Sequence, residues 1–336
     1  MRKFVVAVSF LAGFMACRTA AADETTLIFT DIALPNTPAA GMYHEWADKV
    51  NAAGKGIVHL DIRDGFTLVS SSNFYDRLLN DVVQVTFGST NYLGGQFRLS
   101  QIMALPFLFE SSEEASAVFW RLYQAGLMGA EFDKVIPLAL QGFPQESPHL
   151  IKAPTAPLND LKGLRMIAGG QTMTRVATLL GATPISVPLT DSYEALQRGT
   201  ADGMFFPMAA IHDFKIDEVT HYHPMAPLGG GPGGIWMSKA KFQSLPTAVQ
   251  KILTDNSGEA ASKRLGHLLD QLQGEEPKHL NTLADQKVVS LTAEQHGLWQ
   301  KAVQPIFSSW DEQDKNQAET VLAKAREFAA AVKAGH

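Results

Sequence analysis

Short apolar runs alternate with amphipathic stretches through the first half of the chain. The runs are rich in β-branched and aromatic residues, and they predict strands at 26–30, 57–62, 82–87 and 135–139. Between them, apolar residues recur at helical spacing, which predicts helices at 42–53, 73–80 and 113–126. Strands and helices that alternate in this way form a sheet with parallel pairs, covered by helices on its faces.

A second alternating series begins near residue 164. It predicts strands at 164–168, 185–187 and 203–207, with helices at 172–180 and 191–198. The second of these helices has Asp191 and Glu194 at the spacing of a capping box. Because the two series are joined without an obvious linker, we expect two α/β lobes packed side by side.

Helices are predicted for the last part of the chain. Pro246 begins a stretch that runs toward Gln273, and Gly258 and Gly266 weaken its middle. Thr292 and Gln295 form another capping-box pair, and residues 317–333 are rich in alanine and other strong helix formers.

The N-terminus has the pattern of a secretory signal. Arg2 and Lys3 precede an apolar run at 4–16, and three alanines at 20–22 precede Asp23. The run is shorter than the roughly 20 residues that a membrane span needs. We therefore expect residues 1–22 to be removed and the mature protein to be periplasmic.

Cys17, the only cysteine, lies inside this segment, so cleavage after Ala22 leaves no thiol for a disulfide or a metal site. A rival interpretation makes Cys17 a lipidated N-terminus because Ala16 precedes it, but Phe14 and Met15 do not suit that motif. The 336 residues suffice for two cores, and the formal net charge of −6 without a basic run argues against a nucleic-acid partner.

Two local features invite a chemical role. Residues 229–234 (GGGPGG) lack the context of a nucleotide-binding loop, so we interpret them as a crossover between lobes. His221 and His223, with His212, have no third ligand at a recognised spacing, so we predict no metal and no other cofactor. No catalytic motif occurs, and we expect a binding protein and not an enzyme, although members of a catalytic triad can lie far apart in sequence.

Five segments in order carry a resemblance to a known family. Residues 161–167 (LKGLRMI) are similar to LKGLKIR, 180–184 (LGATP) to LGAxP, and 193–203 (YEALQRGTADG) to YxALQxGxxDG. LPFLF at 105–109 and FQSLPTAVQ at 242–250 extend the match over most of the mature chain. Together they resemble the DctP-type solute-binding proteins of tripartite ATP-independent periplasmic (TRAP) transporters.

This resemblance implies a periplasmic-binding-protein-like α/β fold with two lobes around a ligand cleft, crossing strands and a long helix in the C-terminal half. It implies a small organic solute as ligand and TRAP permease membrane subunits as partners, and we expect a monomer. Lobe 1 would comprise residues 23–143 plus about 233–270, and lobe 2 would comprise 144–232 plus about 271–334.

The chain departs from the family pattern where the ligand is expected. Ile167 stands where the family has an arginine that pairs with the substrate carboxylate, and Pro144 stands where a second arginine often follows Gly-Phe. Residues 204–206 (MFF) replace a polar segment. A buried anion without a charged partner costs several kcal/mol, so we predict a neutral polyol, an aromatic compound or an amine. Arg165, on the same strand face as Ile167, is the alternative partner for an acid.

The cleft is predicted near residues 89–92, 144–146, 165–171, 204–207 and 234–237. In it, Glu146 could pair with a cation while the aromatic residues offer π faces. A ligand sensor or a periplasmic enzyme on the same scaffold are the alternative functions. The candidate ligand-binding residues are Ser89, Asn91, Tyr92, Glu146, Arg165, Ile167, Phe205, Phe206 and Trp236.

Overall fold

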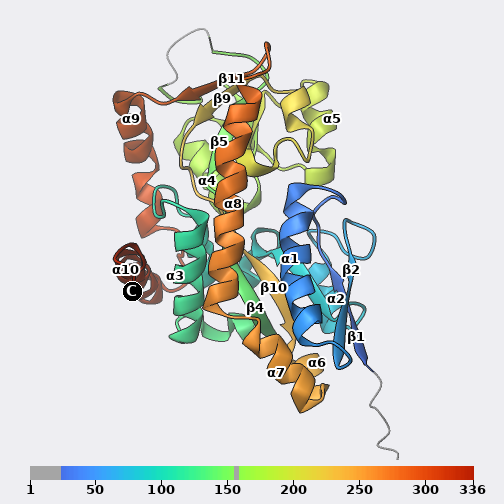
Figure 1. Ribbon diagram of the computed structural model, residues 1–336. Coiled ribbons are helices and arrows are strands. Elements are labelled where there is room, and N and C mark those ends of the chain that lie inside the picture. The colour runs from blue at the N-terminus through green and yellow to red at the C-terminus, as the bar shows by residue number, and fades with distance from the viewer. Residues whose placement is uncertain (1–23, 155–158) are drawn as a thin grey trace, which may run out of the picture.

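Two α/β lobes, each built on its own mixed sheet, lie one above the other in the protein (Figure 1). The computed structural model describes residues 24–154 and 159–336, apart from the side chain of Tyr92. The expected signal segment 1–22, with Cys17, lies outside the described residues. The two-lobed α/β fold that the sequence predicted is confirmed.

The sheet of the first lobe has the strand order β2-β1-β3-β10-β4. β1 pairs in parallel with β2 and β3, whereas β10 runs antiparallel between β3 and β4. Its strands are β1 (Thr25–Thr30), β2 (Val58–Arg63), β3 (Val85–Ser89), β4 (Val135–Gly142) and β10 (Pro232–Ser238).

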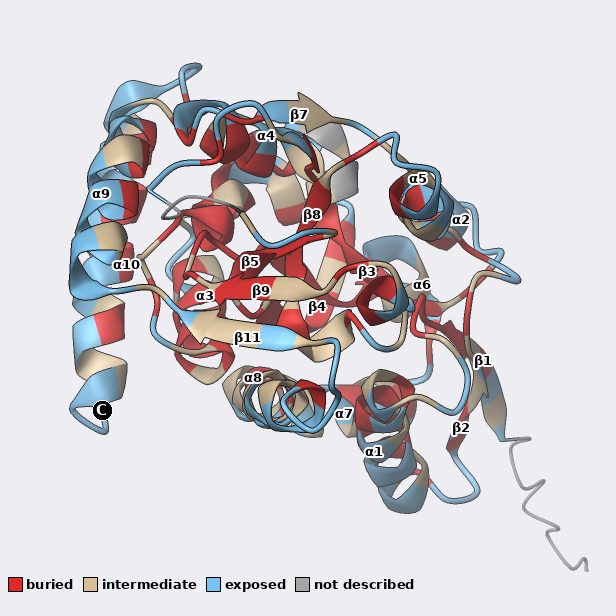
Figure 2. Ribbon diagram, turned by 90° about the horizontal axis from the view of Figure 1, so that it is seen from above, coloured by how far each residue is buried: buried red, intermediate tan, exposed pale blue. Residues whose placement is uncertain are grey.

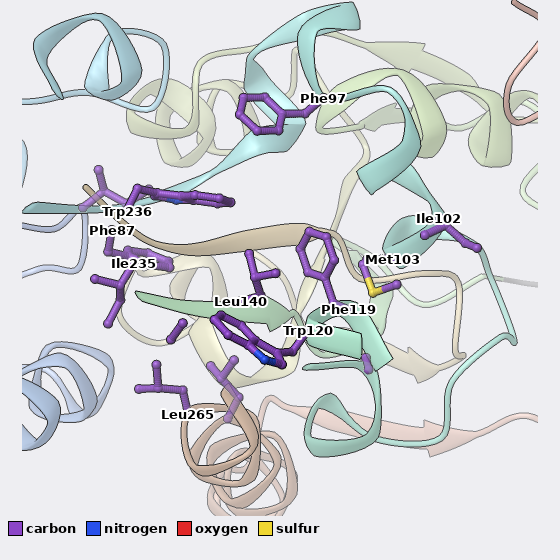
Figure 3. Close-up of a cluster of buried hydrophobic side chains, with 14 of the residues drawn as sticks. Phe87, Phe97, Ile102, Met103, Phe119, Trp120, Leu140, Ile235, Trp236 and Leu265 are labelled. Atoms are coloured by element: carbon purple, nitrogen blue, oxygen red, sulfur yellow. The ribbon is translucent and has the colours of Figure 1, made fainter. Parts of the chain in front are cut away.

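Aromatic and aliphatic side chains together fill the core of this lobe (Figure 3). Trp236 of β10 stacks on Phe132 with ring centroids 5.6 Å apart, and its ring centroid lies 5.8 Å from that of Phe97. Its indole N–H donates a hydrogen bond to the carbonyl oxygen of Gly88 at 3.3 Å, so the polar edge of this buried ring is satisfied.

The sheet of the second lobe has the strand order β11-β9-β5-β8-β6-β7. β6 runs parallel to β7 and β8, and β5 runs antiparallel between β8 and β9. Figure 2 shows β5 and β8 buried in the middle of the molecule. The strands are β5 (Glu146–Leu150), β6 (Arg165–Ile167), β7 (Thr183–Ile185), β8 (Gly203–Pro207), β9 (Tyr222–Met225) and β11 (Lys287–Ser290).

Helices cover both sheets. The α-helices are α1 (Pro38–Ala53), α2 (Phe74–Leu79), α3 (Ser112–Gln124), α4 (Gly170–Leu179), α5 (Ser192–Gln197), α6 (Lys239–Ser244), α7 (Thr247–Asp255), α8 (Glu259–Leu280), α9 (Ala293–Val303) and α10 (Lys315–Lys333). Short 3₁₀ helices are η1 (Thr90–Tyr92), η2 (Gly94–Phe97), η3 (Leu99–Ala104), η4 (Gly129–Phe132), η5 (Leu189–Asp191), η6 (Met208–Ala210), η7 (Ile216–Glu218) and η8 (Gln304–Ser308). None of these described helices is both long and apolar enough to span a bilayer.

The chain crosses between the lobes at three places. Residues 143–145 lead from β4 to β5, and residues 226–231 lead back from β9 to β10. α8 then runs along both lobes, packing on α3 and β4 in the first and on η6 and β11 in the second (Figure 1). α10 packs on α3. We therefore propose that residues 315–333 belong with lobe 1, to which the sequence did not assign them.

Three details of the predicted helices have different outcomes. The capping box of Thr292 and Gln295 is formed at α9. The box predicted at Asp191 is wrong, because Asp191 ends η5 with φ −102° and ψ −3° and makes no side-chain cap among the described residues. The single helix predicted from Pro246 is two helices, which separate at Gly258, where φ is +97°.

Candidate functional site

A cavity of about 150 Å³ lies between the two lobes. The first lobe contributes the segment after β1, helix α1 and the end of β3; the second contributes the start of β5 and the end of β8. In open α/β sheets, ligands bind outside the carboxyl ends of the strands, and β1, β3 and β8 all end here. The crossing helix α8 adds Leu269 and Leu272 to the wall.

Most of the lining is apolar. The apolar side chains are Ile32, Ala33, Ala39, Met42, Phe87, Phe143, Pro144, Leu189, Phe206, Pro207, Ala209, Ala210, Phe214, Leu269 and Leu272. An apolar cavity of this volume is large enough to hold a benzene ring. The described side chains that line it include no lysine, arginine or histidine.

Four polar side chains reach this lining: Tyr43, Ser89, Asn91 and Glu146. The hydroxyl group of Ser89 donates to the carbonyl oxygen of Pro232 at 3.2 Å. The Oδ1 atom of Asn91 is buried and has no hydrogen-bond partner among the described residues. A ligand that donates a hydrogen bond would therefore satisfy Asn91 without displacing a protein contact.

Glu146 is the most unusual of the four. Its backbone is fixed at the start of β5, because its N–H donates to the carbonyl oxygen of Gly229 at 2.8 Å. Its side chain is only 8% exposed, and Oε2 has no hydrogen-bond partner in the described part of the chain. Burial raises the pKa of this carboxyl group well above its usual value. Burial therefore favours the protonated, neutral form of this carboxyl group.

A second acidic group lies beside the cavity. Asp31 directly follows β1, is fully buried, and its Oδ1 accepts a hydrogen bond from the N–H of Ala33 at 2.8 Å. Burial and the neighbouring Asp64 raise the pKa of Asp31 to about 7. Asp64 is itself bound by His44 Nε2 at 2.9 Å. A buried carboxyl group therefore lies one residue from Ile32, which lines the first-lobe side of the cavity.

The structure brings four of the predicted site residues together at this cavity: Ser89, Asn91, Glu146 and Phe206. Phe205, the neighbour of Phe206 on β8, points to the opposite face of the strand and packs in the main core. Pro144, expected beside the ligand because it replaces a family arginine, also lines the cavity.

The other predicted residues lie elsewhere. Ile167 is buried in the small core cluster of the second lobe, and Trp236 is buried in the core of the first lobe. Arg165 is exposed, and its Nη2 atom donates to Oδ1 of Asp202 and to the carbonyl oxygen of Gly199, both at 2.8 Å. Tyr92 lies in η1, and its side chain is outside the described residues.

Several lining residues escaped the sequence prediction. Met42 and Tyr43 of α1, and Leu269 and Leu272 of α8, follow the apolar spacing of ordinary core helices. Nothing in this spacing distinguishes a side chain that lines a cavity from one that packs in a core. A hydrophobic pattern shows which face of a helix is buried but not what covers that face.

The glycine-rich segment 229–234, which we interpreted as a crossover between the lobes, includes the end of the connection from β9 to β10. A Cβ atom on Gly230 would lie 2.0 Å from the carbonyl oxygen of Phe143, so the two crossing segments touch backbone to backbone. Gly229 has φ +101°, and a Cβ there would lie 2.0 Å from the carbonyl oxygen of Ala104. Close approach and this positive φ require glycine at these positions.

His221 and His223 both contact the side chain of Gln286 but differ in burial. His223 is buried, with its Nδ1 atom 2.8 Å from Nδ1 of His149 and its Nε2 atom 2.7 Å from Oε1 of Gln286. His221, two residues earlier, is partly exposed, and its Nδ1 atom lies 3.3 Å from Nε2 of the same Gln286 and 3.5 Å from Oδ2 of Asp285. Burial lowers the pKa of His149 to about 3, so its imidazole stays neutral.

A larger, polar cavity of about 450 Å³ lies on the other side of Asn91. It contains two arginines, but both are already paired with the segment after η8. Arg98 forms an ion pair with Asp311, and Arg175 lies 3.1 Å from Glu312. The guanidinium group of each arginine is therefore already occupied by a carboxylate of the protein.

Residues 29–314 match the model of the bacterial extracellular solute-binding proteins of family 7. The fold is similar to a TRAP solute-binding protein of a marine metagenome in complex with 3-hydroxybenzoate, with TM-score 0.85, 23% identity, and coverage of 92% and 99% of the two chains. It is similar to a TRAP solute-binding protein from Rhodoferax ferrireducens in complex with benzoate, with TM-score 0.84, 24% identity, and coverage of 93% and 100%.

Among the curated proteins, the chain is 22% identical to the C4-dicarboxylate-binding periplasmic protein of Rhodobacter capsulatus. That match covers 90% of this chain and 91% of the relative.

Proposed function

The chain belongs to family 7 of the bacterial extracellular solute-binding proteins, the TRAP receptors, and from this premise we propose that it captures a small organic solute between its lobes and delivers it to TRAP permease subunits. The observation that carries the proposal is the cavity, which residues of both lobes line. A ligand held there contacts both lobes at once, and its binding free energy therefore favours the closed arrangement that the permease would recognise. Export to the periplasm is part of this proposal.

We propose further that the solute is small, with an apolar or aromatic body, and neutral or cationic. The apolar walls and the volume suit a single ring, which is in keeping with the one-ring acids held by the two similar structures. The expected charge of the solute differs from that of these acids. A carboxylate in this cavity would meet Glu146 and the nearby Asp31 without a lining guanidinium group, and it would give up its hydration for no ion pair.

An amine or a hydroxyl group suits the same polar atoms better. An ammonium group can pair with ionised Glu146, and a hydroxyl group can donate to Oδ1 of Asn91. Phe87, Phe143 and Phe206 offer ring edges and faces around it.

Calorimetry with three matched ligands tests the charge directly. Benzylamine, benzyl alcohol and benzoate have the same ring and nearly the same size but differ in charge. We expect the amine and the alcohol to bind the mature, tag-free protein at least about tenfold more tightly than benzoate or succinate. Glu146→Gln should weaken binding of the amine more than binding of the alcohol, because the carboxylate that balances the ammonium charge is gone.

Arg165→Ala is the matched control for this experiment. It removes a charge from the second lobe outside the cavity and should leave the ligand preference unchanged. Tight binding of succinate or malate that Arg165→Ala abolishes would overturn the assignment of ligand charge. Binding of every ligand unchanged in a double variant with Phe206→Asp and Glu146→Gln would place the site elsewhere.

Transport itself needs a cellular measurement. Deleting the gene should abolish uptake of the identified ligand, and supplying the protein in trans should restore it. If uptake continues while a membrane-bound kinase loses its response to the ligand, the protein is a sensor component instead.

A further inference from the structure

Three side chains that can bind a metal meet on the surface of the second lobe, and none of them belongs to the lining of the cavity. They are His212, which follows η6, and Glu276 and His279 of α8. One ligand atom from each lies within 4.8 Å of the others. We propose that these three residues form a binding site for Zn²⁺ or a similar divalent transition-metal ion that prefers imidazole.

The two α8 ligands have the right spacing. Glu276 and His279 are three residues apart, so they project from the same face of the helix. His212 approaches this face from the segment between η6 and η7, and its ring centroid lies 5.7 Å from that of His279. Two imidazoles and one carboxylate are a known protein ligand set for zinc, with water in the remaining position.

His212 is already oriented as a metal ligand. Its Nδ1 atom lies 2.8 Å from Oδ2 of Asp217, whose side chain is only 7% exposed. A carboxylate in this place accepts the Nδ1 proton, which leaves the lone pair of Nε2 for a metal. Metal-bound histidines commonly have such a carboxylate partner.

Two unpartnered carboxyl oxygen atoms belong to this cluster. Oε1 of Glu276 and Oδ1 of Asp217 are buried and have no hydrogen-bond partner among the described residues. A divalent cation would supply the missing partner for these carboxylates.

The site would connect α8 to the segment that forms one wall of the cavity. Ala209, three residues before His212, lines the cavity, and its N–H donates to Oε1 of Gln273 on α8 at 2.8 Å. Gln273 Nε2 in turn donates to the carbonyl oxygen of Gln145 in the crossover at 3.1 Å. A metal bound by His212 and the α8 ligands would add a second connection between this segment and α8, beside the hydrogen bond of Ala209.

Titration of the tag-free mature protein with ZnCl₂ at pH 8, in competition with a chromophoric chelator, tests the proposal. We expect one Zn²⁺ per chain and a rise in Tm of about 2 °C or more at saturating Zn²⁺. Mg²⁺ and Ca²⁺, which prefer oxygen ligands, should not reproduce either effect.

Four variants decide whether these residues are responsible. His212→Asn and His279→Asn should each weaken Zn²⁺ binding at least about tenfold, and Asp217→Asn should weaken it by about tenfold through the orientation of His212. His59→Asn, an exposed histidine of β2 in the other lobe, is the control and should bind as the wild type does. An unchanged Tm without Zn²⁺ shows that each variant is folded.

Two results would overturn the site: Zn²⁺ affinity unchanged in both His212→Asn and His279→Asn, or no Zn²⁺ binding above that of a double variant lacking both histidines.

Discussion

Asp31 and Glu146 show how burial changes the chemistry of single residues in this protein. Both are carboxyl groups near the inter-lobe cavity, and burial raises the pKa of each. In water such groups would be ionised at neutral pH and would repel an acidic ligand only weakly. Inside the protein, burial favours the protonated form of each carboxyl group, and the proposed preference for a cation depends on the ionisation of Glu146 when such a ligand binds.

The raised pKa of Asp31 predicts a specific dependence of stability on pH. Its pKa is about 7 in the folded state and 3.8 in the unfolded chain, so the folded state holds this proton more tightly. The group contributes fully to stability below pH 3.8, and the contribution is lost as the pH rises through 7. Asp31→Asn should therefore raise the free energy of unfolding relative to wild type at pH 8, by up to about 4 kcal/mol, and much less at pH 4.

Urea unfolding of both proteins at pH 4, 6 and 8 measures this difference. Asp48→Asn, an exposed aspartate of α1, serves as the control for the simple loss of a charge. A stability difference for Asp31→Asn that stays constant from pH 4 to 8 would contradict the raised pKa.

At the scale of elements, α8 must fit two surfaces at once, because it packs on parts of both lobes. Its glycines differ sharply in surroundings. A Cβ atom on Gly266 would lie 2.5 Å from the carbonyl oxygen of Ser112 in α3, whereas one on Gly274 would meet nothing within 4 Å. Gly266 is thus the point at which α8 and α3 approach backbone to backbone.

This difference predicts opposite effects of the same substitution on one helix. Gly274→Ala should stabilise the protein by up to about 1 kcal/mol, because alanine has the higher helix propensity. Gly266→Ala should destabilise it by about 1–3 kcal/mol, because the added methyl group forces α8 away from α3. Thermal and urea unfolding of the two variants provide the comparison, and equal shifts in both would show that the close contact is absent.

At the scale of the whole molecule, the position of the mature N-terminus can be measured directly. β1 begins at Thr25, so cleavage after Ala22 leaves every described element intact. We expect the exported protein to have the mass of residues 23–336 and to be recovered in the periplasmic fraction. A mass that corresponds to a chain beginning at lipid-modified Cys17 would show that it is a lipoprotein.

The sequence by itself determined most of the elements and the family. Alternating apolar patterns placed the strands from β1 to β4 and from β6 to β8 within a few residues, because side-chain periodicity follows directly from backbone geometry. The Thr292 capping box was also local, and it formed as predicted. Collinear motifs such as LKGLRMI and LPFLF indicated the family that the match over residues 29–314 bears out.

Only the tertiary structure decided which residues share a surface. Phe205 and Phe206 are the same residue type, and strand alternation places them on opposite faces of β8. Only the packing of the second lobe decides which of the two lines the cavity. Arg165 appeared available for an acid until its contact with Asp202 was seen, and His212 lacked ligands until α8 placed Glu276 and His279 beside it. Local pattern fixes the direction of a side chain within its own element, whereas its partner comes from a distant part of the chain and depends on how both lobes close around α8.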